Sequence, residues 1–225
     1  MHSLATLILT LLVTTAAHAA QPYHLELEAT PDAVFPWLSR FGKVDLHVYA
    51  GGVRGEALWL HGFSRNGDKA VTVANPLARM YVDVQTSEIA PILTKLAGSS
   101  AGIERRVKPV LGHSIKGQVK GIDATRHRIV YGSAYIDVWT TEVIPPNAQL
   151  RTLVNNVVSG ISPGSAAIAS KLPGTPIYVE LNFRRFKKVV LVRMKKLTFA
   201  ADDEEDALTL GNLYVRAGIL EKLFR

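Results

Sequence analysis

Residues 54–85 read RGEALWLHGFSRNGDKAVTVANPLARMYVDVQ, and their pattern decides the fold. The side chains alternate as in a strand, and one face is expected to carry Ala57, Trp59, His61 and Phe63, the other Leu58 and Leu60. Asn66-Gly67-Asp68 predicts a hairpin turn, because Asn and Gly adopt the positive φ angles that such turns need. Two further strands are expected at Ala70–Ala74 and Met80–Gln85. The stretch therefore indicates an antiparallel meander.

The rest of the chain adds more strands and two helices. Strand patterns occur at Tyr23–Glu28, Asp45–Tyr49, Ser114–Lys120, Arg126–Tyr131, Tyr135–Thr141, Ile177–Phe183 and Val189–Phe199. Helices are predicted at Ser87–Ala97 and Pro145–Ile161, and Leu208–Phe224 fits either a strand or a helix. The second helix has an apolar stripe made of Leu150, Leu153, Val154, Val157 and Val158. These elements predict an α+β domain built on a large antiparallel sheet.

The N-terminus predicts export. Leu4–Val13 is apolar but about ten residues long, roughly half of what spans a bilayer, and Ala17-His18-Ala19 has the form that signal peptidase cuts. We therefore expect a signal peptide at 1–19, cleavage after Ala19, and a single periplasmic domain at 20–225. The chain has no cysteine, so it has no disulfide. Its net charge is +7. Anionic headgroups, cell-wall polymers or an acidic envelope protein are the expected partners of such a charge, rather than nucleic acid.

The order of the elements is similar to that of a known family. Arg54–Arg65, the Asn66-Gly67-Asp68 turn and Ala70–Tyr81 resemble the opening strands of the periplasmic lipoprotein-carrier (LolA-like) fold family. Gly117–Thr141, with Trp139 near its end, resembles the later strand pair, and Pro176–Phe199 the closing hairpin. The resemblance implies a strongly curved antiparallel sheet, a half-barrel, with helices packed on or inside its concave face and an acyl chain bound there. The arginine that locks the lid in the best-known carriers has no match here.

Several strands lack clean alternation, which favours either helices over both faces or an inner face that encloses a cavity. We expect this interior to bind a lipid, an acylated molecule or another hydrophobic ligand. The residues expected to line it are Trp59, Phe63, Tyr81, Tyr135, Trp139, Leu153 and Val157. Its mouth is expected to carry Arg184, Arg185 and Lys187, a basic cluster that fits anionic headgroups or an acidic partner, or is a solvated strand edge. The sequence predicts a monomer with no cofactor and no metal.

Two other classes stay open. A periplasmic hydrolase could use Asp or Glu with His, and the candidates are Glu56, Asp83, Asp137, His47 and His61. The letters Gly-x-Ser-x-Gly also occur around Ser100 and Ser162, but both follow predicted helices rather than strands. A structural envelope protein, with side chains filling the interior, is the third class.

Overall fold

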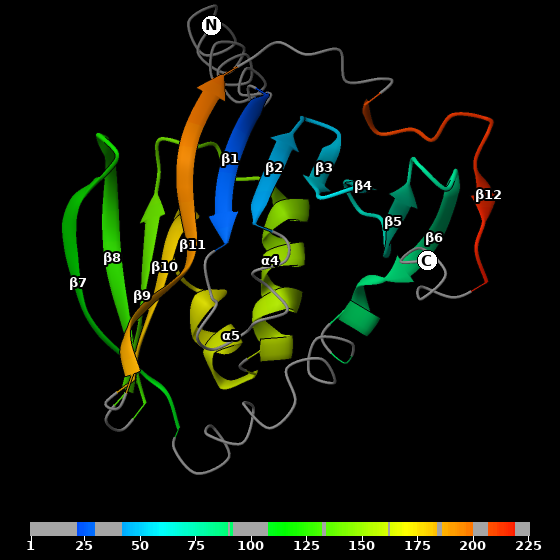
Figure 1. The fold of residues 1–225 in the computed structure, drawn as a ribbon. Helices are drawn as coiled ribbons and strands as arrows, with labels where there is room; N and C mark the ends of the chain where they lie inside the picture. Colours follow the sequence, from blue (N-terminus) through cyan, green and yellow to red (C-terminus); the bar gives the residue numbers. More distant parts are fainter. Residues whose placement is uncertain are drawn as a thin grey trace, which may run out of the picture.

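A computed structural model describes residues 22–29, 42–89, 91, 108–131, 134–161, 163–183, 186–199 and 207–218. The strands are β1 (Tyr23–Ala29), β2 (Lys43–Val48), β3 (Gly52–Ala57), β4 (Leu60–Arg65), β5 (Ala70–Asn75), β6 (Met80–Gln85), β7 (Val110–Val119), β8 (Ile122–Tyr131), β9 (Ala134–Thr141), β10 (Thr175–Phe183), β11 (Phe186–Phe199) and β12 (Val215–Arg216). The helices with assigned bounds are α4 (Ala148–Ile161) and α5 (Pro163–Ala169) (Figure 1). Residues 86–89 are also helical, but most of the helix predicted at Ser87–Ala97 lies outside the described residues.

The described strands form one large sheet in the order β12-β6-β5-β4-β3-β2-β1-β11-β10-β9-β8-β7. β1 to β6 form one antiparallel meander and β7 to β11 a second, and the pairing of β1 with β11 joins them. The short β12 runs parallel to β6 at one end of the sheet. The prediction of a large antiparallel sheet with few helices is confirmed, and the sheet is not closed into a barrel. No helix in the described part of the chain is long and apolar enough to cross a membrane.

The apolar stripe of α4 packs on the centre of the sheet. Leu150, 7% exposed, belongs to a core cluster with Leu25, Val53 and Met194, and Leu153 and Val154 pack against this cluster. Side chains from the sheet thus fill the space under the helix. Such burial is the main source of stability in a fold without disulfides. The predicted stripe is confirmed for these three residues, while the side chains of Val157 and Val158 lie outside the described residues.

Polar side chains fix where α4 starts and which face of the sheet it covers. Asn147 Oδ1 accepts a hydrogen bond from the backbone N–H of Leu150 at 2.9 Å, so Asn147 caps the helix. Gln149 Nε2 donates to Ser64 Oγ at 2.6 Å, and both side chains are buried. Because Ser64 faces α4, its neighbour Phe63 faces the other side of the sheet.

The shorter helix α5 covers the same face of the sheet. Its Ile168 packs with Val138 and Val179. Val179 pairs with Val192, two residues before the core residue Met194, so Val179 and Met194 share a face. We call the opposite side of the sheet the far face. On β1 its side chains are His24, Glu26 and Glu28, whereas Tyr23 and Leu25 are in the core.

The strand predicted across Ala57–Phe63 is wrong in one respect. Ala57 pairs with Leu60, so Leu58 and Trp59 form a two-residue turn between β3 and β4. Leu58 has φ 56°, and both side chains are exposed, Leu58 by 52% and Trp59 by 41%. The turn has neither Gly nor Asn, the usual signals for a hairpin. The irregular alternation around Trp59 therefore reflects a chain reversal rather than a strand covered on both faces.

A buried histidine links β7, β8 and β9. His127 is 4% exposed, its Nδ1 lies 2.9 Å from Ser114 Oγ, and its Nε2 lies 3.0 Å from Thr140 Oγ1. Both ring nitrogens have hydroxyl partners, which neutral imidazole can satisfy. Burial lowers the pKa of His127 below its usual value.

This burial predicts acid sensitivity. The unfolded chain takes up a proton on His127 at a pH near 6.5, whereas the folded chain does so only at lower pH, so the free energy of unfolding should fall as the pH drops from 7 to 5. His127→Gln keeps a donor and an acceptor but does not titrate, so its urea-unfolding free energy should change less over this range. His113→Gln, at an exposed site on β7, is the matched control and should keep the wild-type slope. Equal slopes in all three proteins would contradict the prediction.

Candidate ligand-binding groove on the far face

Four side chains form a row across neighbouring strands of the far face. Arg126 on β8 pairs with Trp139 on β9, Trp139 pairs with Tyr178 on β10, and Tyr178 pairs with Arg193 on β11. Adjacent strands lie about 4.8 Å apart, so these residues are direct neighbours. Two aromatic rings are thereby flanked by an arginine on each side.

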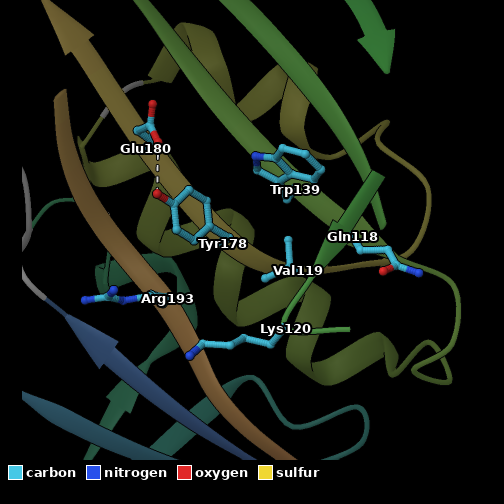
Figure 2. Close-up of a pocket in the computed structure, with 7 residues that line it drawn as sticks. All are labelled: Gln118, Val119, Lys120, Trp139, Tyr178, Glu180 and Arg193. Carbon is cyan, nitrogen blue, oxygen red and sulfur yellow. Dashed lines mark hydrogen bonds between the residues drawn. The ribbon is translucent and has the colours of Figure 1, made fainter. Parts of the chain in front are cut away.

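Three members of this row, Trp139, Tyr178 and Arg193, line a groove of about 270 Å³ (Figure 2). Its seven lining residues are Gln118, Val119, Lys120, Trp139, Tyr178, Glu180 and Arg193. The first three come from the end of β7 and from the turn that leads into β8. Lys120 and Gly121 have φ of 53° and 79°, as in the tight turns that connect twisted strands. The hairpin tip thus forms one wall, and β9, β10 and β11 form the floor.

The position of the Trp139 ring depends on a glycine. A Cβ atom at Gly117 would lie 3.0 Å from Cζ3 and 3.2 Å from Cη2 of Trp139. The indole therefore packs directly against the backbone of β7, and a larger residue at position 117 would push it out of place. Trp139 is half-buried and also packs against the main core cluster.

The groove residues on β10 and β11 are held by hydrogen bonds. The Tyr178 hydroxyl donates to Glu180 Oε2 at 2.9 Å, as drawn in Figure 2. Burial, followed by this bond to Glu180, raises the pKa of Tyr178 to about 12. Arg193 Nη2 donates to Glu28 Oε2 at 2.9 Å, and Lys195 lies 2.8 Å from the same oxygen. The groove therefore has an ordered polar wall at pH 7.

A strong ion pair lies beside the groove. Arg128 donates two hydrogen bonds of 2.7 Å to Asp137, which is 4% exposed. The guanidinium of Arg128 lies 3.8 Å from the centroid of the Tyr135 ring, in cation–π geometry. The bond to Asp137 raises the pKa of Arg128. Bidentate pairs of this kind hold their partners in one orientation, so β8 and β9 are rigidly joined next to Trp139.

The predicted site residues that the structure describes lie on both faces of the sheet rather than together. Trp139 lines the groove, and Tyr135 lies two strand positions beyond Asp137 on the same face. Phe63 and Tyr81 also lie on the far face, but in the other meander, and Trp59 lies in its turn. Leu153 packs in the core on the opposite side of the sheet. Arg184 and Arg185, like the side chains of Val157 and Lys187, lie outside the described residues.

The groove residues that no sequence pattern marks as site residues are Gln118, Val119, Lys120, Tyr178, Glu180 and Arg193. Their strands were predicted, but no local motif marks them. The available signals were the alternation Tyr178-x-Glu180 and the turn pair Lys120-Gly121. Neither signal tells which strands pair.

The predicted catalytic candidates are dispersed over the far face. Glu56 bonds Arg54 at 2.9 Å, Asp83 accepts from Thr72 at 2.8 Å, and Asp137 pairs with Arg128. The side chains of these carboxylates lie on β3, β6 and β9, none of which is adjacent to another. Ser100 and Ser162 lie outside the described residues.

The histidines do not form a site either. His47 and His61 share the far face, but β3 lies between their strands. His47 stacks on His24 with ring centroids 4.2 Å apart, and His61 Nδ1 lies 3.2 Å from Arg54 Nη2. Within the described ranges, no three His, Cys, Asp or Glu residues are grouped so that they could hold a metal ion.

Comparisons with known proteins give a distant likeness at the level of the fold. No family model matches the chain, and no curated protein matches its sequence. PNGF-II, in a C2 crystal form, is 11% identical with a TM-score of 0.45, over 91% of this chain and 32% of its own. An uncharacterized conserved protein from Thermus thermophilus is 9% identical with a TM-score of 0.47, over 93% and 99%. LprF from Mycobacterium bovis is 10% identical with a TM-score of 0.33, over 87% and 93%.

This chain spans about a third of the PNGF-II chain. With such identities and TM-scores, none of these proteins transfers an activity or a ligand to this one. Membership of the lipoprotein-carrier family stays a hypothesis, and the proposals below rest on the residues of this chain.

Proposed function

We propose that this protein is an exported, non-catalytic carrier for an amphipathic ligand, a lipid or an acylated molecule, in the cell envelope. In this proposal, cleavage after Ala19 releases a monomeric periplasmic domain whose half-barrel sheet holds the helices on its concave face. The basic cluster at Arg184, Arg185 and Lys187 contacts an anionic membrane surface or an acidic envelope protein.

The observation that carries the proposal is the mixed chemistry of the groove. Trp139, Tyr178 and Val119 supply apolar surface, while Lys120, Gln118 and Arg193 supply polar groups at its border. Ligand sites typically combine a mostly apolar lining with a few placed polar groups. The Tyr178 hydroxyl is bonded to the Glu180 carboxylate, but its pKa is raised to about 12, so the hydroxyl is a poor nucleophile at neutral pH and binding fits the groove better than hydrolysis does.

The size and location of the groove limit what it can hold. Its volume of about 270 Å³ is just below the roughly 300–1,000 Å³ of typical ligand pockets. It therefore fits one segment of a larger ligand, such as part of an acyl chain with its first polar group. The ligand in this proposal lies on the far face, because core side chains occupy the space beneath Leu150.

Binding of a dansylated undecanoic acid tests the proposal. In a Trp37→Phe/Trp59→Phe background, Trp139 is the last of the three tryptophans, so all energy transfer to the dansyl group comes from Trp139. We expect saturable transfer, and in the wild-type background Trp139→Ala should weaken probe binding about tenfold, or ~1.4 kcal/mol.

The matched control is Trp59→Ala, since Trp59 is exposed in a turn away from the groove. It should bind the probe as the wild type does, and both variants should show the wild-type circular dichroism spectrum. Unchanged affinity in a folded Trp139→Ala protein would contradict the assignment of the groove. Lipid mass spectrometry on protein purified from its native envelope would identify the natural ligand.

A further inference from the structure

We infer that the ligand of the groove carries an anionic group, a phosphate or a carboxylate, which binds beside Lys120; this inference rests on the proposed function. The groove thus selects anionic over neutral amphiphiles. The inference comes from the polar groups that line the groove and from the partners that each already has.

Most polar side chains of the lining are already engaged. Gln118 Nε2 donates to Asp123 Oδ1 at 2.9 Å, Tyr178 donates to Glu180, and Arg193 donates to Glu28. Among the described residues, the two polar lining side chains without a hydrogen bond or ion pair are Lys120 and Trp139. An ammonium group and an indole N–H are donors only. A ligand that satisfies both must present acceptors.

The charges around the groove favour an anion over a cation. Each nearby carboxylate is bound by a donor. Glu28 is bound by Arg193 and Lys195, and the others pair as Glu180 with Tyr178, Asp137 with Arg128 and Asp123 with Gln118. A cationic ligand would have to displace one of these donors. The ammonium of Lys120 has no such competitor within the described part of the chain, so an anion pairs with it at no such cost.

The place of Lys120 sets the direction of the ligand. Lys120 is at the tip of the β7–β8 hairpin, and its side chain extends toward β11 in Figure 2, on the side of Arg193. Trp139 and Val119 lie further along the same groove. An amphiphile that places its anionic group beside Lys120 therefore lays its apolar part over Val119 and the Trp139 ring.

The test compares dodecyl phosphate, dodecanoate and the neutral dodecyl maltoside, each below its critical micelle concentration, by isothermal titration calorimetry at low salt. Wild-type protein should bind the two anionic probes five- to tenfold more tightly than the neutral one, and this difference should shrink with salt. Lys120→Gln should reduce it to about twofold or less.

Lys116→Gln is the matched control. It removes the same charge from the same hairpin. Ile115 pairs with Arg126 and therefore lies on the far face, so the next residue, Lys116, lies on the opposite face of the sheet. This variant should keep the wild-type preference. Competition by inorganic phosphate separates the sources of the anion, since weak or no competition indicates an amphiphile headgroup.

The outcomes separate the two proposals. Equal wild-type affinity for anionic and neutral probes, or an undiminished preference in folded Lys120→Gln, overturns the inference and leaves the carrier function standing. No binding of any amphiphile overturns the carrier function. Binding of inorganic phosphate alone, lost in Lys120→Gln, supports the anion site while removing the carrier function.

Discussion

Leu150→Asp is expected to lower the free energy of unfolding by about 4–6 kcal/mol, a large part of the stability of the protein. The substitution loses roughly 2–3 kcal/mol of apolar burial and places an unpaired carboxylate among Leu25, Val53 and Met194, at a further cost of several kcal/mol. Single domains are stable by only about 5–15 kcal/mol. Urea unfolding followed by circular dichroism measures the effect.

Thr152→Asp is the control for this change. It adds the same charge two residues along α4 at an exposed position, so it should cost less than about 1 kcal/mol. Similar losses in the two variants would show that charge on the helix, rather than burial of its stripe, determines the effect. A loss under about 0.5 kcal/mol in Leu150→Asp would mean that α4 does not cover the core.

The features that the sequence predicted well are those that local chemistry determines. The period of Leu150, Leu153 and Val154 marks the buried side of α4 without any knowledge of its partner. Asn66-Gly67 marks a turn because Gly67 needs φ 86°. Such signals depend on residues a few positions apart, and the strands and turns they predict are largely present.

The face on which each predicted site residue lies could not be read from the sequence, because it depends on which way each strand faces. Phe63 and Ser64 are neighbours, yet only Ser64 reaches Gln149 on α4. A strand shows the same alternation whichever face is buried. Shifting the strand by one residue relative to its neighbours moves every side chain to the other face of the sheet. The unexpected turn at Leu58-Trp59 added a second error of this kind.

The groove could not be predicted either, because it depends on which distant strands pair with each other. The sequence predicts Trp139 as a binding residue, but its neighbours Tyr178 and Arg193 come from strands that follow two helices and a loop. Their proximity depends on the register of β9 with β10, in which Thr141 pairs with Thr175 and Trp139 with Tyr178. No pattern within either strand contains this register.

The pairing of β9 with β10 begins at Thr141 and Thr175, and we expect a large loss of stability from a substitution at the neighbouring Gly174. This residue directly precedes β10 and has φ 74°, and a Cβ atom there would lie 2.5 Å from the carbonyl oxygen of Thr141 and 2.8 Å from its carbonyl carbon. Backbone atoms cannot move aside as a flexible side chain can. Gly174→Ala should therefore cost about 3 kcal/mol or more, by combining left-handed strain of roughly 1–2 kcal/mol with a forced shift of β9 against β10.

Gly67→Ala separates the two causes. Gly67, in the turn between β4 and β5, also has a positive φ, 86°, but nothing lies within 4 Å of its Cβ position, so this variant should lose only the strain. Because the shift at Thr141 displaces Trp139 from Tyr178, Gly174→Ala should also weaken binding of the dansylated probe at temperatures where it remains folded, whereas Gly67→Ala should leave binding within about twofold of the wild type. Urea unfolding and energy transfer from Trp139 measure the two effects. Equal stability losses in the two variants would show that backbone strain alone acts at Gly174 and that its contact with Thr141 does not set the register of the groove.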